Sequence, residues 1–183
     1  GSVWSAIIKG SEAVVAVKMV HALSTQDLAI MRREVAALRW ARLPGVVRLL
    51  DDGSVGADYF IVMEYLQGAH FPGRSGQQPW SAVAAPTQQL LESLARLHHA
   101  GLIHRDLKPA NIMVDSHGRP TVIDLGIAAG RALRHSLRDA YTPAYAAPEQ
   151  ILGQTSDART DLYAAGVMLY EMPSGRLPPT PDR

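Results

Sequence analysis

The sequence has 183 residues, 47% of them hydrophobic, which is enough for a folded protein with a buried core. Its 18 basic and 17 acidic side chains give a net charge of +1, which excludes a chain-wide attraction to nucleic acid or to an anionic membrane. The absence of cysteine excludes disulfides and thiolate metal sites, and no apolar run reaches the roughly 18 residues of a membrane span. We expect a cytoplasmic location, with a membrane tether elsewhere in a longer parent protein left open.

The first elements expected are a strand and a helix. Residues 13–20 alternate with period two, which places Lys18 on one face with small apolar residues such as Ala16. The next segment ends at a Pro-Gly pair, and Glu34 borders its apolar stripe. That stripe has helical spacing and consists of Leu28, Met31, Val35 and Leu38.

Two strand-like runs follow at 46–53 and 59–66, and the glycine-containing segment between them predicts a hairpin. Glycine and proline then crowd residues 68–79, which argues against regular structure and indicates a linker. We place a boundary just before this linker. The expected parts are an N-terminal part, residues 1–66, and a C-terminal part, residues 67–183.

The second part begins with a helix expected at 84–99, because its leucines keep a helical period. The octapeptide HRDLKPAN, residues 104–111, then lies in the loop after that helix. The runs NIMVD and PTVIDLG predict a short hairpin whose second strand ends at Asp124. A polar and basic stretch leads to TPAYAAPEQ, and a last helix is expected at about 161–171.

Seven short features occur in a fixed order along the chain. They are GSV at residues 1–3, VAVK at 15–18, Glu34, HRDLKPAN, DLG at 124–126, APE at 147–149, and Asp161. Each is weak alone, but their order resembles that of the eukaryotic-type (Hanks-type) Ser/Thr protein kinases found in bacteria. The resemblance implies an α+β, two-lobed fold with a β-rich N-lobe and a mainly helical C-lobe, here incomplete at both termini. It also implies ATP-dependent phosphoryl transfer to Ser or Thr of a protein substrate.

The resemblance assigns catalytic roles to the loop that follows the buried helix. Asp106 would accept or orient the proton of the attacking hydroxyl, and Lys108 would balance charge on the γ-phosphate. Asn111 and Asp124 would hold Mg²⁺. Thr142 fits the threonine that bridges the base and the lysine in Ser/Thr kinases, which favours Ser or Thr acceptors over Tyr.

The resemblance also implies a nucleotide site between the lobes. Lys18 and Glu34 would pair, because each is costly to bury alone, and the lysine would then face the α- and β-phosphates. The backbones of Glu64 and Leu66 in the hinge would bind the adenine edge. The remaining contacts would come from Gly1 at the phosphate loop, Val3 and Ala16 above the adenine, Met63 at the back and Met113 below.

Regulation is expected at the segment before APE. Arg105 precedes the base, an arrangement that in this family receives a phosphorylated segment, and Ser136 is the serine available for that phosphate. Glu149 of APE would lack the arginine that usually pairs with it in the family.

Two alternatives stay open at this stage. A small-molecule phosphotransferase shares a base aspartate, a downstream asparagine and a metal aspartate, although Lys108, Thr142 and APE argue against it. A non-catalytic nucleotide-binding or scaffolding module is opposed by the full set of catalytic side chains. It is favoured by a chain that begins at what looks like the third glycine of the phosphate loop. We therefore expect this chain alone to be a poor catalyst.

Overall fold

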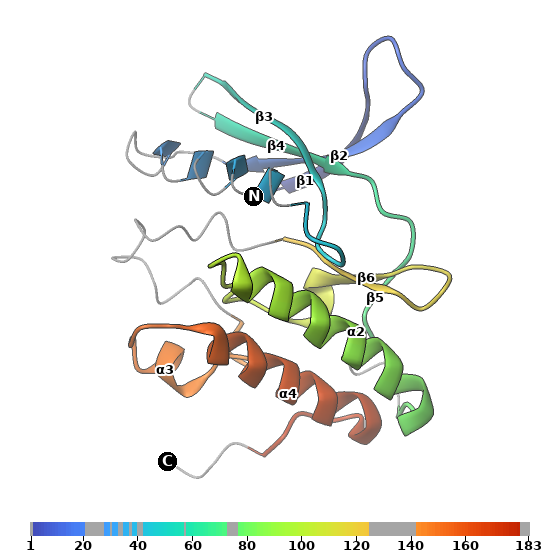
Figure 1. The fold of residues 1–183 in the computed structure, drawn as a ribbon, viewed down its shortest axis with the longest axis vertical. Helices are drawn as coiled ribbons and strands as arrows, with labels where there is room; N and C mark the ends of the chain where they lie inside the picture. The colour runs from blue at the N-terminus through green and yellow to red at the C-terminus, as the bar shows by residue number, and fades with distance from the viewer. Residues whose placement is uncertain are drawn as a thin grey trace.

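The structure is a computed structural model that describes residues 2–20, 28–29, 31–32, 35–36, 38–39, 42–56, 58–72, 77–124 and 142–179. A four-stranded sheet lies at one end of the molecule, and two long helices lie at the other (Figure 1). This arrangement agrees with the α+β class expected from the sequence.

The four strands at the upper end form one antiparallel sheet in the order β1-β2-β4-β3. The predicted hairpin is present as the pair β3 and β4. β1 was not expected from the sequence. It pairs with β2 along its whole length although nearly all its residues are exposed, so backbone bonds and not a buried face define it. The strands are β1 (Ser2–Ile7), β2 (Val14–Val20), β3 (Leu49–Val55) and β4 (Asp58–Glu64).

The face of this sheet that carries Lys18 is the one that packs onto the core. In the antiparallel register, Lys18 of β2 lies opposite Ile61 of β4, and Ala16 lies opposite Met63. Directly opposed residues share a face, and both β4 residues are buried. The described residues between 28 and 39 are helical, as expected, and the stripe members Met31, Val35 and Leu38 are buried.

The lower part contains a three-stranded sheet and two long helices. Its strands are β5 (Ala69–His70), β6 (Ile112–Val114) and β7 (Pro120–Val122), so the second predicted hairpin is confirmed. β5 lies in the segment that the sequence predicted to be irregular. Its two residues form a strand there because they pair with β6. The helices are α2 (Trp80–His99), the short 3₁₀ turn η1 (Pro109–Asn111), α3 (Pro148–Ile151) and α4 (Ala158–Ser174).

Helix α2 packs against both α4 and β7, and it is longer than the sequence predicted. It begins four residues earlier than expected, with Pro79 at the N-cap position and Pro86 inside the helix. Leu90, Leu94 and Leu97 are buried along one side, as their spacing required. Among the described residues, no helix combines the length and apolar character needed to cross a bilayer.

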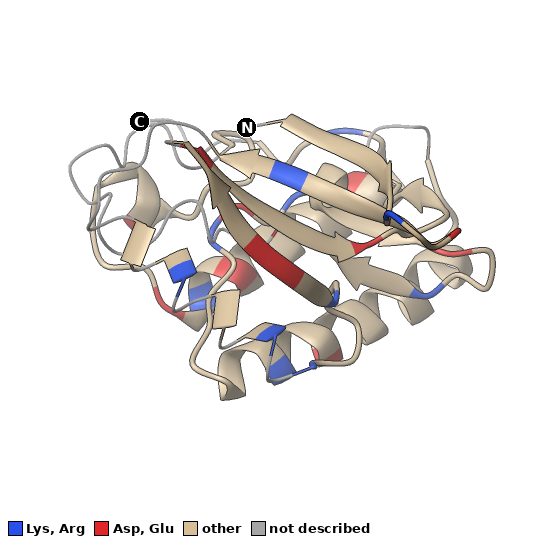
Figure 2. Cartoon of the chain, turned by 90° about the horizontal axis from the view of Figure 1, so that it is seen from above, with Lys and Arg blue, Asp and Glu red and all other residues tan. Residues whose placement is uncertain are grey.

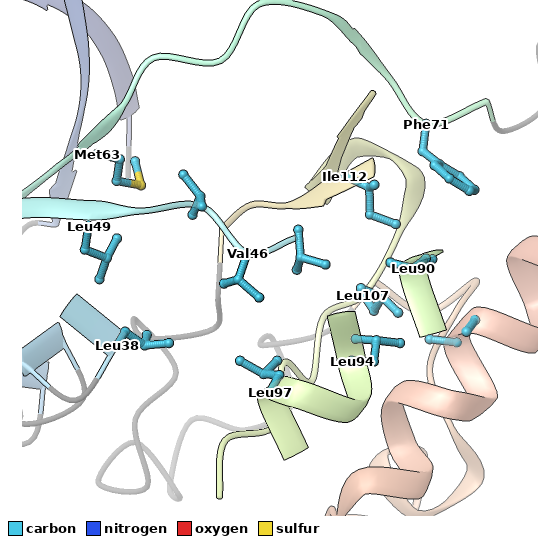
Figure 3. Packing of buried hydrophobic residues seen from close by; sticks show 14 of the residues in the cluster. Leu38, Val46, Leu49, Met63, Phe71, Leu90, Leu94, Leu97, Leu107 and Ile112 are labelled. Atoms are coloured by element: carbon cyan, nitrogen blue, oxygen red, sulfur yellow. The ribbon is translucent and has the colours of Figure 1, made fainter. Parts of the chain in front are cut away.

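One hydrophobic cluster connects the two parts of the molecule. Figure 3 shows Val46 between the sheet residues Leu49 and Met63 and the leucines of α2. The backbone reinforces this contact, because the amide of Val47 donates to the Val122 carbonyl at 2.9 Å. The amide of Val122 in turn donates to the Gly45 carbonyl at 2.9 Å. The loop before β3 therefore pairs with the strand that leads to Asp124.

A polar cluster ties the upper sheet to the helical segment of residues 28–39. The side chain of Tyr59 is fully buried, and its hydroxyl donates to Asp52 Oδ2 at 2.5 Å. Arg39 Nη1, from the helical segment, lies 3.1 Å from Asp51 Oδ1 and 3.5 Å from Asp52 Oδ1. Burial raises the pKa of Tyr59 above its ordinary value, and the hydrogen bond and charge of Asp52 raise it further.

We expect Tyr59→Phe to lower the free energy of unfolding by about 1–3 kcal/mol, because a buried hydrogen bond to a carboxylate is lost. Urea denaturation at neutral pH measures this loss. The Tyr59 pKa is raised in the folded state, so its stabilisation is complete below the unfolded tyrosine pKa of about 10 and declines at higher pH.

The matched control is Tyr163→Phe on α4, where the tyrosine is 43% exposed. It should change the unfolding free energy by no more than about 0.5 kcal/mol. Equal effects of the two substitutions would contradict a structural role for the Tyr59 hydroxyl.

Candidate active site

A buried aspartate holds the loop that follows α2. Asp161 in α4 has no exposed surface, and its Oδ2 accepts from the His104 amide at 2.9 Å while its Oδ1 accepts from the Arg105 amide at 2.8 Å. His98 Nε2, near the end of α2, lies 2.8 Å from Asp161 Oδ2. The carboxylate thus joins the two long helices to the start of the HRDLKPAN loop.

The loop also contacts the segment after β7 through the ring of His104. The Nδ1 atom of this ring accepts from the Asp106 amide at 3.3 Å, and Nε2 lies 3.1 Å from the Ile123 carbonyl. A neutral ring with its proton on Nε2 satisfies both contacts. His104 therefore sets the distance between the residues before Asp106 and those before Asp124.

Two residues of this region adopt a left-handed backbone. Arg105 has φ of 69° and Asp124 has φ of 53°. Such a conformation costs a non-glycine residue on the order of 1–3 kcal/mol and persists only where the surroundings impose it. For Arg105 the surroundings are the bond to Asp161 and a bond from Gln150 Nε2 to the Arg105 carbonyl at 2.7 Å.

The side chains of Asp106, Lys108 and Thr142 form a closed triangle. Thr142 donates to Asp106 Oδ1 from both its amide and its hydroxyl, each at 2.9 Å. Lys108 Nζ donates to Asp106 Oδ2 at 2.7 Å and to Thr142 Oγ1 at 2.8 Å. Asn111 Nδ2 donates to the Asp106 carbonyl at 2.8 Å, which fixes the backbone beneath the carboxylate.

Lys18 Nζ, from strand β2 of the upper sheet, forms an ion pair with Oδ1 of Asp124, which follows β7. Lys18 is the one charged residue in β2. Figure 2 shows the charged residues of the sheet as coloured bands on its strands. The lysine side chain is 14% exposed and that of Asp124 is 42% exposed, so the pair lies at the edge of the buried region. The sequence predicted Glu34 as the partner, and Glu34 lies outside the described residues.

A cavity of about 160 Å³ opens beside this ion pair. Its surface is almost wholly apolar, although the charged side chains of Lys18 and Asp124 belong to its lining. The cavity brings together every described residue that the sequence proposed for the nucleotide. Its lining consists of Val3, Ala16, Lys18, Val47, Met63, Glu64, Tyr65, Leu66, Met113, Ile123 and Asp124.

Sequence reasoning missed three residues of this lining. Val47 follows the Pro-Gly pair, Tyr65 lies between the proposed hinge residues Glu64 and Leu66, and Ile123 directly precedes Asp124. Ile123 could have been predicted, because it is the neighbour of Asp124, a proposed metal ligand. No comparable signal marked Val47, because a loop bond to β7 brings it to the cavity. Two proposed residues besides Glu34, namely Gly1 and Ser136, also lie outside the described residues.

The chain also matches a known protein family. A family model described as the protein kinase domain matches residues 1–182. The chain belongs to the protein kinase domain family. The resemblance seen in the motifs is thereby confirmed, and so is the kinase-like fold.

Several curated relatives of this kinase domain carry Ser/Thr kinase names. The chain is 37% identical to serine/threonine-protein kinase pkn2 of Myxococcus xanthus, over 80% of this chain and 19% of the relative. It is 37% identical to probable serine/threonine-protein kinase PknB of Bifidobacterium longum, over 92% of this chain and 27% of the relative. It is 33% identical to serine/threonine-protein kinase PknL of Mycobacterium tuberculosis, over 88% of this chain and 42% of the relative. The chain thus spans less than half the length of these relatives.

The APE motif of this kinase domain has a partner that the sequence did not suggest. Thr160 Oγ1 donates to Glu149 Oε1 at 2.6 Å. Thr160 is buried and directly precedes Asp161. Helix α4 therefore anchors the APE motif and the HRDLKPAN loop through two consecutive residues.

We expect Asp161→Asn to destabilise the kinase domain by about 2–3 kcal/mol, because an amide replaces a carboxylate whose two oxygens accept bonds from His104 and Arg105. Backbone hydrogen exchange at His104 and Arg105 should also become faster. Chemical denaturation and hydrogen-exchange mass spectrometry measure the two effects.

Asp157→Asn, at the N-cap of the same helix, is the matched control. Asp157 accepts from the Arg159 amide at 2.8 Å, and asparagine caps helices about as well as aspartate. Its stability and exchange should stay close to wild type. Unchanged exchange at His104 and Arg105 in Asp161→Asn would contradict the anchoring role of this carboxylate.

Proposed function

We propose that this domain transfers the γ-phosphate of ATP to serine or threonine hydroxyls of proteins. Membership of the protein kinase domain family supports the reaction class, and the names of the relatives support the Ser/Thr class. The observation that carries the proposal is the triangle of Asp106, Lys108 and Thr142.

The triangle supports a reaction in which Asp106 handles the proton of the acceptor. The acceptor oxygen forms a bond to the γ-phosphorus, the bond from that phosphorus to the β–γ bridging oxygen breaks, and ADP leaves with the electron pair. The hydroxyl proton passes to the Asp106 carboxylate. Lys108 lies 2.7 Å from this carboxylate, so it can hold Asp106 in place and offset negative charge on the transferred group.

Thr142 supports a Ser or Thr acceptor through the position of its hydroxyl. This hydroxyl links the carboxylate to the ammonium, and the Thr142 amide contacts the same carboxylate oxygen. The segment that contains Thr142 therefore lies directly against Asp106. Such proximity suits a short acceptor side chain, since the reacting hydroxyl must approach Asp106 from beside this segment.

The lining of the cavity suits the base of ATP. Apolar side chains form most of it, and the backbone of the hinge residues Glu64 and Leu66 offers polar groups to an adenine edge. Lys18 suits phosphate oxygens at the other end. We assign residues 1–66 to an N-lobe that covers the nucleotide, and residues 67–183 to a C-lobe that carries the catalytic loop.

Asn111 and Asp124 fit a Mg²⁺ site by their chemistry. Both offer hard oxygen donors, which this ion requires. Asn111 uses its amide nitrogen on the Asp106 carbonyl, and no described residue donates to its amide oxygen. Mg²⁺ held there would neutralise charge on the phosphates of the nucleotide.

Asp106→Asn tests the proposed base. We expect the rate of phosphate transfer to fall by about 10²–10⁴-fold, because the amide cannot accept the proton, while ATP binding stays close to wild type. The assay uses radiolabelled ATP, Mg²⁺ and a generic protein substrate, and calorimetry measures nucleotide binding. Asp115→Asn, in the exposed turn between β6 and β7, is the control. An Asp106→Asn variant with wild-type turnover would refute the assignment.

Substitutions of Thr142 test whether the acceptor is Ser or Thr and not Tyr. We expect Thr142→Ser to keep most of the activity, whereas Thr142→Val loses the bridge to Lys108 and should be slower by about 100-fold, as expected for a small misplacement of reacting groups. Peptides that differ only in a Ser, Thr or Tyr acceptor measure the selectivity. Phosphorylation of the Tyr peptide as fast as the Ser peptide by wild type would contradict the proposal, as would transfer to small molecules alone.

A further inference from the structure

A second cavity, of about 230 Å³, lies behind the hinge and shares Val47 and Glu64 with the nucleotide cavity. The loop of residues 42–48, between the helical segment and β3, forms most of it. Leu38 and Leu43 supply apolar surface, and Thr121 of β7 contributes a hydroxyl-bearing side chain. The proposed phosphoryl transfer makes no use of this cavity.

The charged groups of the cavity are two arginines and one glutamate. Arg48 and Glu64 satisfy each other, because the Arg48 amide donates to Glu64 Oε1 at 2.8 Å and the Arg48 Nε atom lies 3.9 Å from Oε2. The Glu64 amide also donates to the Arg48 carbonyl at 3.0 Å. Arg42 is exposed, and no described residue forms an ion pair or side-chain hydrogen bond with its guanidinium. The residues that line the cavity therefore carry one positive charge in excess.

The loop that presents Arg42 is held in a costly conformation. Arg42 has φ of 41°, which is a left-handed value for a residue with a Cβ atom. The loop is fixed just beyond it, since the Val46 amide donates to the Leu43 carbonyl at 3.1 Å and Gly45 accepts from Val122. The arginine thus extends from a backbone that is already ordered, which lowers the entropy cost of binding.

We propose that this cavity is a second ligand site, for a small amphipathic carboxylate. The carboxylate would bind the Arg42 guanidinium, which matches its planar geometry with two parallel hydrogen bonds. The apolar body would pack against Leu38 and Leu43. A cavity of about 230 Å³ is smaller than the roughly 300–1,000 Å³ that drug-sized ligands occupy, so it suits a single ring.

The probe for this site is phenylacetate, with phenylacetamide as its uncharged analogue. Titration of the whole chain, followed by two-dimensional amide NMR, should give saturable shifts at Leu43, Val46 and Thr121. The amide analogue should bind about tenfold more weakly or not at all, because it cannot form the charge-assisted pair. The shifts should persist in the presence of saturating ATP and Mg²⁺.

Three variants locate the site. Arg42→Gln removes the charge, and Arg42→Gly removes both the charge and the backbone strain of the left-handed conformation that the first variant retains. Both should weaken phenylacetate binding by about tenfold or more, as expected for loss of a bidentate ion pair. Arg119→Gln, an exposed arginine in the turn before β7, should leave the affinity unchanged.

Several results would overturn the proposal. One is undiminished binding to Arg42→Gly, and another is equal affinity for the acid and the amide. Displacement of phenylacetate by ATP, with shifts centred on Leu66 and Met113, would assign the binding to the nucleotide cavity instead. Absence of saturable shifts in the wild-type chain would exclude the site. All of these readouts are independent of kinase activity, so they are separate from the test of the proposed function.

Discussion

The buried carboxylate of Asp161 is the constraint on which the active-site geometry depends. It is a charge without exposed surface, and such a group is tolerated only if its oxygens accept hydrogen bonds. The amides of His104 and Arg105 and the ring of His98 satisfy it. The loop backbone is therefore fixed before any substrate binds, and the position of Asp106 follows from that of its two predecessors.

Helix α4, which carries Asp161, also supports the segment that contains Glu149 and Gln150. Thr160 holds Glu149, and Gln150 next to it bonds to the Arg105 carbonyl. The segment of Thr142 and the loop of Asp106 thus share one support, although 36 residues separate the two. A shared support explains how a triangle of three side chains from two segments can close with distances of 2.7–2.9 Å.

The sequence indicated which side chains lie together better than it indicated the contacts that hold them there. Motifs such as HRDLKPAN bring together residue types that few functions require at one place. The order of these motifs along the chain was therefore enough to indicate Asp106, Lys108 and Thr142. β1 and the approach of Val47 to the cavity depend on backbone hydrogen bonds, and these leave little trace in side-chain patterns. The long-range anchors were also hidden, because nothing local to Thr160 indicates that its hydroxyl faces Glu149.

The backbone pairing of Gly45 and Val47 with Val122 has a consequence for dissecting the molecule. The bonds run between a loop of the N-terminal part and a strand of the C-terminal part, and Val46 is buried in the cluster that both parts share. Division of the chain at the hinge would leave the amide and carbonyl of Val122 without these partners and would expose Val46 to water. We therefore expect the two parts to stabilise each other, and each half expressed alone to be less stable than it is in the whole chain.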